Sequence, residues 1–597
     1  MQVYDAPLRD MRFVLHELHQ DDGFGSLAAL EEFSPDLIDA ILEEAGRFSR
    51  DVLLPINRIG DEEGCRLENG VVRTPSGFAD AYRQFREGGW TAIAGDAAHG
   101  GQGLPEGVNK MVEEMISSTN VAFGLYPGLS HGAALALAAV ASDEIKDKYL
   151  GRITDGTWAA TMCLTEAHCG TDLGLLRTRA TPRDDGSYTL DGAKIFISGG
   201  DQDLTENIVH LVLARLPDAP KGVKGISLFL VPKYLPNADN SLGNSNGVSV
   251  TAIEHKMGIH GTSTCQLAFD GSQGWLVGRP NKGMEGMFKM MNSERLSVGI
   301  QGLGLGEAAY QAAVYYAKDR IQGRALSGPA QPEKAADSII VHPDVRRMLM
   351  TMRAYNEGCR ALGAWVARAM DAERFSPDPE VKQRAGDFVQ LMTPVVKALF
   401  TDLGFESTNL AVQVYGGHGY IAESGVEQYV RDARIAMIYE GTNGIQALDL
   451  VGRKLPAHMG RYLRSFFHPV SNFIEENGAA ADKGLAKMIE GLGQAFGALQ
   501  LSTGMIAECG LKDPEEAGAA ATDYLRLLGL VAMGYCFARS AKLALARLAE
   551  GSDDGFYRSK LATARFFFDR LLPQATTCFL AIKSGKAAMM ALEEAAF

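Results

Sequence analysis

Cysteine is scarce in this sequence: eight residues are scattered over 597 positions, and no pair has the CxxC spacing. This distribution excludes a disulfide framework and a zinc ribbon, because both need closely and regularly spaced cysteines. One segment gathers side chains that could bind a metal, "CLTEAHC", with Cys163, Glu166, His168 and Cys169. Its spacing matches no usual zinc site and Cys163 falls in a predicted strand, so we expect no metal there.

Long apolar runs and an excess of positive charge are also missing. No stretch approaches the roughly 18 uninterrupted apolar residues of a membrane span, which predicts no transmembrane segment. Residues 1–22 mix acidic with basic side chains and lack an apolar core with a cleavage site, so we expect no signal peptide and a cytoplasmic protein. A formal charge of −15 disfavours a nucleic-acid partner.

Phosphate-binding motifs are absent as well. The sequence has no GxxxxGK[ST] segment, and only Gly302, Gly304 and Gly306 suggest a dinucleotide fingerprint. The third glycine comes one position early, no predicted strand precedes it, and no acidic residue follows a second strand at the usual interval. We interpret these glycines as sites of close helix packing.

The chain has three regions with different residue patterns. Its 597 residues, 46% hydrophobic and 22% charged, are enough for several domains. Residues 1–157 show helical spacing of apolar side chains, as in the segment that follows Ser34. Residues 158–280 are short β-branched or aromatic runs between turns, and helices return from 281. Strands and helices do not alternate, which argues against a doubly wound fold and predicts a mainly α protein with an inserted β domain.

The segment "AMIYEGTNGIQ" at 436–446 places one carboxylate, Glu440, between an apolar run and a Gly-Thr-Asn-Gly stretch. A glutamate with a pKa near 4.3 is a weak base in water, and removal from water raises that value. Glycines let a backbone approach a ligand and point amide hydrogens at it. These residues suggest a proton-abstraction site, and the solvated end of a helix is the alternative.

Five segments, in order, resemble signature blocks of the acyl-CoA dehydrogenase family. They are "KYLGRITDGTW", "CLTEAHCGTDL", "GAKIFISGG", "NSERLSVGIQGLG" and "VQVYGGHGYIAESGVEQYVRDARIAMIYEGTNGIQ". The resemblance implies an N-terminal helical domain (1–157), a middle β-barrel-like domain (158–280) and a C-terminal four-helix bundle (281–455). It also implies non-covalent FAD and a fatty acyl-CoA thioester as ligands.

The resemblance further implies α,β-dehydrogenation of the thioester. Glu440 matches the family's base, which takes the proton α to the carbonyl while a β hydrogen leaves as hydride to the flavin. The carbonyl oxygen would accept hydrogen bonds from a ribityl hydroxyl and from the backbone N–H of Glu440, and one such donor is worth about 10² to 10³ in rate. Glu294 matches the base of a subgroup of the family. We favour Glu440, because enzymes that use the other position lack the glutamate of "YEGT".

Other ligand contacts are carried over from the matching motifs. Those expected at FAD are Met162, Leu164, Thr165, Thr171, Phe196, Ile197, Ser198, Arg320, Gln413, Gly416, Gly417, Thr442 and Gly444. Those expected at the substrate are Asn292, Glu294, Arg295 and Gly441. In the family, Arg320 and the glycine turn reach FAD across a subunit boundary, which implies a homo-oligomer, a homodimer or a tetramer. The long insertion between Arg320 and His342 departs from many relatives.

The beginning of the chain, that insertion and a helical extension at 456–597 resemble a large bacterial subgroup. This subgroup includes 3-methylmercaptopropionyl-CoA dehydrogenase and broad-range fatty acyl-CoA dehydrogenases. We therefore expect an acyl-CoA dehydrogenase of fatty acid β-oxidation, or one acting on the methylthio substrate, that passes electrons to an electron-transferring flavoprotein. An oxygen-using acyl-CoA oxidase and a non-catalytic acyl-CoA- or flavin-binding relative are the alternatives.

Overall fold

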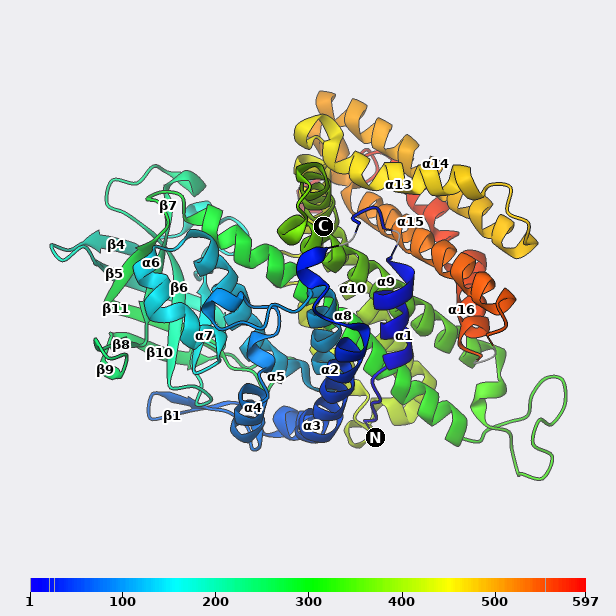
Figure 1. Ribbon diagram of the computed structural model, residues 1–597, viewed down its shortest axis with the longest axis horizontal. Coiled ribbons are helices and arrows are strands. Elements are labelled where there is room, and N and C mark those ends of the chain that lie inside the picture. The colour runs from blue at the N-terminus through cyan, green and yellow to red at the C-terminus, as the bar shows by residue number, and fades with distance from the viewer. Residues whose placement is uncertain (1, 21, 26, 553–554) are drawn as a thin grey trace. The chain divides into compact units, whose positions relative to one another are not determined.

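The computed structural model describes residues 2–20, 22–25, 27–552 and 555–597 (Figure 1). The chain forms two compact units. The β unit comprises Ala45–Leu104 and Thr119–Ser297, and the helical unit comprises Met1–Glu44, Pro105–Ser118 and Val298–Phe597. Three helices run from one unit into the other: α2 (Pro35–Phe48), α5 (Glu106–Val140) and α8 (Gly283–Asp319).

A closed ring of strands forms the centre of the β unit. Its members are β4 (Arg179–Pro182), β5 (Tyr188–Ser198), β6 (Asn207–Arg215), β7 (Ile226–Pro232) and β11 (Thr264–Val277). The ring closes because β11 pairs with both β5 and β7, while β4 links β5 to β6 and β6 pairs with β7. Two further strands, β3 (Trp158–Cys163) and β10 (Val248–Ile253), pair with β6 and β11. The expected barrel-like β domain is confirmed.

Both faces of this sheet are buried, which explains the continuous apolar runs of β6 and β7. One face packs on itself around Val212, Phe229 and Phe269. The other face packs against the end of α5 and the first turns of α8, through side chains such as Leu137 and Met290. The sheet is therefore a rigid support for the residues at its strand ends.

One element of the β unit was missed by the sequence analysis. The region expected to be helical contains a hairpin of β1 (Arg66–Glu68) and β2 (Val71–Arg73), near the helices α3 (Leu54–Glu63) and α4 (Phe78–Glu87). Its turn residues Asn69 and Gly70 both have positive φ, at 52° and 79°. An Asn-Gly pair between short β-branched runs is a strong hairpin signal, so the sequence did carry this information.

Long helices make up the helical unit. They include the end of α8, α9 (Pro343–Phe375) and α10 (Pro379–Tyr415), followed by the short α11 (Glu427–Arg434) and α12 (Asn443–Asp449). Gly302 lies in α8 against the backbone of α10, where an added Cβ would stand 2.6 Å from the Phe400 carbonyl oxygen. The interpretation of the glycine run as a site of close helix packing is confirmed.

The described part of the C-terminal extension, drawn in yellow to red in Figure 1, contains five α-helices. They are α13 (Arg461–Asn477), α14 (Lys483–Lys512), α15 (Pro514–Ala549), α16 (Phe556–Phe566) and α17 (Gln574–Ser584). α14 and α15 start at aspartate caps, Asp482 and Asp513, whose carboxylates accept hydrogen bonds from backbone N–H groups of the first turn. The middle of α15 is buried on nearly all sides.

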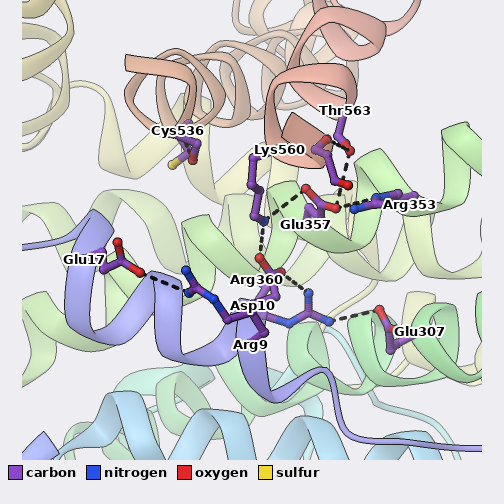
Figure 2. A network of polar contacts seen from close by, with 12 residues as sticks. Arg9, Asp10, Glu17, Glu307, Arg353, Glu357, Arg360, Cys536, Lys560 and Thr563 are labelled. Atoms are coloured by element: carbon purple, nitrogen blue, oxygen red, sulfur yellow. Dashed lines mark hydrogen bonds and ion pairs between the residues drawn. The ribbon is translucent and has the colours of Figure 1, made fainter. Parts of the chain in front are cut away.

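A buried network of charges joins this extension to the rest of the helical unit (Figure 2). Arg360 of α9 binds three carboxylates, Asp10 of α1 (Leu8–Arg12), Glu114 of α5 and Glu307 of α8. Lys560 of α16 pairs with Asp10 and, at 3.0 Å, with Glu357. Elements far apart in the sequence thereby share one set of ion pairs.

Burial in this network changes the pKa of one carboxyl group, that of Glu114. Burial raises the pKa of Glu114 to about 7, although the charge of Arg360 acts to lower it. Arg360 is 2% exposed and Glu114 is fully buried. Charged groups are costly to bury, so an intact network of this kind adds little to the stability of the fold. Removing one partner destabilises the protein strongly, because another charge then stays buried without its partner.

Among the described residues, three helices are long and apolar enough to cross a bilayer by length and composition alone: Glu106–Val140, Pro379–Tyr420 and Pro514–Ala549. The prediction of no transmembrane segment was based on the lack of long uninterrupted apolar runs. In these three helices, polar residues interrupt the apolar ones. Buried residues make up 61%, 83% and 83% of their most apolar windows. Most of this apolar surface therefore packs inside the protein.

Candidate active site

Glu440 lies at a sharp break in the backbone. A short 3₁₀ helix, Ile435–Met437, ends just before it, and α12 begins just after it at Asn443. Glu440 has a φ of 57° and Gly441 a φ of 90°, and Thr442 caps α12 by accepting a hydrogen bond from the Ile445 N–H. A left-handed backbone at a residue with a side chain costs roughly 1–2 kcal/mol, and such conformations concentrate at functional sites.

Neighbouring side chains hold this turn. The buried amide of Gln446 donates hydrogen bonds to the carbonyl oxygens of Glu440 and Gly441, each at 3.3 Å. The hydroxyl of Tyr439 donates to Gln301 of α8. Glu440 itself is half-buried. The backbone on both sides of the carboxylate is thus fixed from α8 and from α12.

A second group of predicted residues lies at the ends of two strands in the β unit. β3 leads to Met162, Leu164 and Thr165, and the carbonyl oxygen of Thr165 accepts a 2.9 Å hydrogen bond from the N–H of Ile195 in β5. The structure therefore brings the "MCLT" and "FIS" segments together at one edge of the sheet. Thr171 lies in the exposed loop that follows β3.

Phe196 has an unusual conformation in this group. The pairing of β5 with β11 is irregular next to it, since Ile197 pairs with Cys265 and Lys194 pairs with Leu267. Phe196 has a φ of 58°, and its side chain is 59% exposed, while Ile197 is buried and Ser198 half-buried. A bulge of this kind re-aims a side chain, and here it presents an aromatic ring at the surface of the unit.

The turn between these strand ends depends on Glu166. Its carboxylate accepts hydrogen bonds from the N–H groups of Arg177 and Thr178, from the Thr178 hydroxyl, and from Lys194 at 2.8 Å. Lys194 also donates to the Leu164 carbonyl oxygen at 3.0 Å. Burial raises the pKa of Glu166, but Lys194 and these hydrogen bonds outweigh it and lower the pKa to about 2. Glu166 is therefore a structural anion.

These contacts also explain the suspected metal ligands. Ligand atoms of Glu166, His168 and Cys169 lie within 4.8 Å of one another. Backbone hydrogen bonds at 2.9 and 3.0 Å join Glu166 and Cys169 in both directions, and the His168 ring bonds the Leu175 carbonyl oxygen. The polar groups of this turn are engaged with one another, so the turn itself explains why these side chains lie close together.

The predicted substrate residues of "NSER" lie in the part of α8 that belongs to the β unit. Glu294 and Arg295 are buried and Asn292 is half-buried. Arg295 donates a weak hydrogen bond to Asn292 at 3.4 Å. A Cβ added to Gly132 of α5 would stand 2.4 Å from the Glu294 carboxylate. Glu294 therefore packs tightly against α5, without the backbone break seen at Glu440.

A third group lies where α8 and α10 end in the helical unit. Tyr316 of α8 stacks on Tyr415 of α10 with ring centres 4.1 Å apart, and its hydroxyl lies 3.3 Å from the His418 ring. Four predicted residues are exposed at these helix ends: Arg320, Gln413, Gly416 and Gly417. The φ of 60° and ψ of −139° at Gly416 favour glycine. The structure brings this predicted set together.

Profiles of known families match most of the chain. Those described as the N-terminal, middle and C-terminal domains of acyl-CoA dehydrogenase match residues 37–157, 161–272 and 281–455. A fourth, described as acetyl-CoA dehydrogenase C-terminal like, matches 466–593. The chain belongs to the acyl-CoA dehydrogenase family. The predicted family and fold class are confirmed.

Individual relatives share nearly the full length. A 3-methylmercaptopropionyl-CoA dehydrogenase of Ruegeria pomeroyi is 42% identical over 577 residues, which cover 96% of this chain and 97% of the relative. The broad-specificity linear acyl-CoA dehydrogenase FadE5 of Mycobacterium tuberculosis is 34% identical over 631 residues, covering 100% of both. The crystal structure of Caenorhabditis elegans ACDH-11 in complex with C11-CoA has a similar fold, with a TM-score of 0.79 at 20% identity over 96% of this chain and 92% of that one.

Membership makes this chain an acyl-CoA dehydrogenase, an oxidoreductase whose family cofactor is FAD. The residues at the ends of β3 and β5 fit a flavin, because they include the exposed Phe196 ring and the half-buried Met162 and Thr165. The sequence analysis missed the residues that fix these segments, Lys194 and Gln446. Both lie inside or next to quoted motifs, but only their burial shows what they hold.

Proposed function

We propose that this acyl-CoA dehydrogenase converts an acyl-CoA thioester to the trans-2-enoyl-CoA with Glu440 as its base. The observation that carries this assignment is the left-handed backbone at Glu440, fixed on both sides by Gln446 and Tyr439. A strained backbone conformation persists only when surrounding contacts hold it, and such conformations are common at ligand sites.

The chain's own groups would divide the work as follows. The Glu440 carboxylate takes the proton from the carbon α to the thioester carbonyl. The backbone N–H of Glu440 donates to the carbonyl oxygen, where negative charge develops, and a donor placed at such an oxygen is worth about 10² to 10³ in rate. One residue can supply both groups only if its backbone turns, as the φ of 57° allows. Asn292, Glu294, Arg295 and Gly441 would contact the CoA thioester.

FAD, when bound, accepts the β hydrogen with its electron pair. Phe196, Ile197 and Ser198 of β5 would lie beside the flavin ring, with Met162, Leu164, Thr165 and Thr171 around the ring and pyrophosphate. Arg320, Gln413, Gly416 and Gly417 would bind the adenosine half from a second copy of the chain, with Thr442 and Gly444. A guanidinium suits phosphate because its charge is permanent and its donors are forked.

For the acyl group we propose a fatty acyl chain or the 3-methylmercaptopropionyl group. The two relatives described above support both, since one is named for the methylthio substrate and the other for broad linear acyl-CoA specificity. One methylene usually changes discrimination by only about 1–3 kcal/mol, so a few side chains decide between these substrates.

We also propose that the enzyme is a cytoplasmic homo-oligomer that passes electrons to an electron-transferring flavoprotein. All eight cysteines are free thiols, six of them buried, which suits a reducing compartment. Size measurement by light scattering tests the oligomer. Reoxidation of the reduced enzyme by that flavoprotein, compared with reoxidation by air, separates a dehydrogenase from an oxygen-using oxidase.

Glu440→Gln tests the base assignment. We expect turnover to fall by 10³-fold or more, of the order of the largest single-residue catalytic losses. Flavin content, read from the visible spectrum, should stay at the wild-type level, because the variant changes one oxygen to an amide. Glu294→Gln is the comparison and should not lose most of its turnover, because we expect Glu294 to contact the substrate without taking its proton. The opposite pattern, with Glu294 essential and Glu440 dispensable, would exchange their roles.

A panel of acyl-CoA substrates tests the substrate class. Short, medium and long straight chains and the methylthio compound are mixed separately with enzyme, and flavin bleaching is followed without oxygen. Rapid bleaching with only the methylthio compound would exclude the fatty acyl assignment. Bleaching across straight chains with none for the methylthio compound would exclude the other.

A further inference from the structure

Asn443, just after the Glu440 turn, contacts several groups of α10. Its amide group donates to the Ala398 carbonyl oxygen at 3.2 Å and to the Asp402 carboxylate at 2.7 Å. Its carbonyl oxygen accepts a 2.8 Å hydrogen bond from Lys397. The Thr401 hydroxyl also lies 3.0 Å from the amide nitrogen, and all four partners lie within two turns of α10. A side-chain amide offers two donor hydrogens and one oxygen, and here each is engaged.

Lys397 is the unusual member of this set. It is fully buried in the interior of the helical unit, where an ammonium group needs strong partners to stay charged. The Asn443 oxygen supplies one, and the Asp402 carboxylate stands on the other side of the same amide. Asn443 thus bridges a buried cation and an anion on α10, and this polarises its amide and strengthens both hydrogen bonds.

The short segment from 440 to 443 transmits this attachment to Glu440. Asn443 is the first residue of α12, Thr442 is its cap, and Gly441 separates the cap from Glu440. Gln446 of the same helix bonds the Glu440 and Gly441 carbonyl oxygens. If α12 moves, the left-handed turn moves with it, and α12 is attached to α10 through Asn443.

We propose that Asn443, held by Lys397 and Asp402, is a positioning residue that fixes α12 and thereby the Glu440 carboxylate against the substrate. This inference rests on the proposed role of Glu440 as base. It assigns no proton transfer to Asn443 or Lys397. Misplacement of a reacting group by about 1 Å can cost a factor near 10² in rate, so the attachment matters even though it lies behind the turn.

Asn443→Ala tests this role with two readouts. We expect kcat to fall by a factor of roughly 10 to 10², with KM close to the wild-type value because the substrate contacts remain. Amide hydrogen exchange in residues 436–446 should be faster, since the turn loses its attachment. The control is Asn409→Ala, an exposed asparagine further along α10, which should change neither readout.

Lys397→Met provides a second route, should Asn443→Ala fold poorly. It replaces the charged side chain by an uncharged, unbranched one of similar length. It should show the same two changes to a smaller degree, because Asp402 still holds the amide. The exposed Lys382→Met is its control. Adding Asn443→Ala to Glu440→Gln should cause little further loss, since a positioning residue has nothing left to position.

The outcomes separate this inference from the base assignment. If Glu440→Gln loses turnover while Asn443→Ala keeps it, the positioning role is wrong and the base assignment stands. If Asn443→Ala loses turnover without faster exchange at 436–446, the residue acts by another route and the proposed attachment is overturned. If Glu440→Gln keeps turnover, the base assignment fails, and this inference fails with it.

Discussion

Glu166 of the β unit and Glu440 of the helical unit are held in opposite ways. At Glu166 the protein fixes the side chain: two backbone N–H groups, a hydroxyl and the buried Lys194 all bond the carboxylate. At Glu440 the protein fixes the backbone, which takes a left-handed turn between Gln446 and Tyr439. A carboxylate whose oxygens are all engaged serves the fold. A half-buried carboxylate on a firmly held main chain suits a reaction with a ligand.

Glu166→Gln gives the largest expected loss of stability. The substitution leaves Lys194 buried without its anion, and breaking a buried pair in this way costs about 3–5 kcal/mol. We expect the free energy of unfolding in urea at pH 7 to fall by that amount. Glu440→Gln should lower it by much less, because Glu440 is only half-buried. Equal losses in the two variants would show that the two glutamates are held alike.

The stability of the protein should also depend on pH through Glu166. Because the pKa of Glu166 falls to about 2 on folding, its contribution is complete above about pH 4.5 and is lost as pH falls toward 2. Wild-type protein should therefore lose stability more steeply in acid than Glu166→Gln does. The exposed Glu423→Gln should follow the wild-type curve.

Glu114 sharpens the comparison, because it is also buried and paired but its pKa moves the other way. Its folded pKa of about 7 lies above the value near 4.5 in the unfolded chain. Its contribution is therefore complete below pH 4.5 and is lost as pH rises to 7. Over that range the loss is on the order of 3 kcal/mol, and Glu114→Gln should remove it.

The measurement is the difference between wild type and Glu114→Gln in unfolding free energy from pH 4.5 to 7.5. Burial also raises the pKa of Asp371 to about 7, so both proteins share a decline from that residue. Only the difference reports on Glu114. A constant difference across the range would mean that Arg360 keeps Glu114 ionised, as Lys194 does Glu166.

Particular residues show what the sequence could predict. The runs of β6 and β7 and the caps of α14 and α15 follow from local rules, because burial and capping depend on residue type and spacing. The turn at Asn69 and Gly70 was equally local and was overlooked. The motif around Glu440 identified the candidate base. Its attachment to Lys397 did not follow, since 46 positions separate Lys397 from Asn443 and only the packed fold brings them together.

Phe196 shows that backbone strain is not confined to the helical unit. Its strained backbone lies in the β unit, at a place where we also propose that a ligand binds. Its left-handed conformation is costly and its ring, 59% exposed, adds little buried apolar area, so neither stabilises the fold. Phe196→Gly should raise the unfolding free energy of the flavin-free protein by about 0.5–1 kcal/mol and weaken FAD binding. Asn240→Gly, at a φ of 63°, should gain less, since asparagine adopts this conformation readily. If Phe196→Gly binds FAD as tightly as wild type, the bulge has another purpose, and backbone strain marks the ligand site only at Glu440.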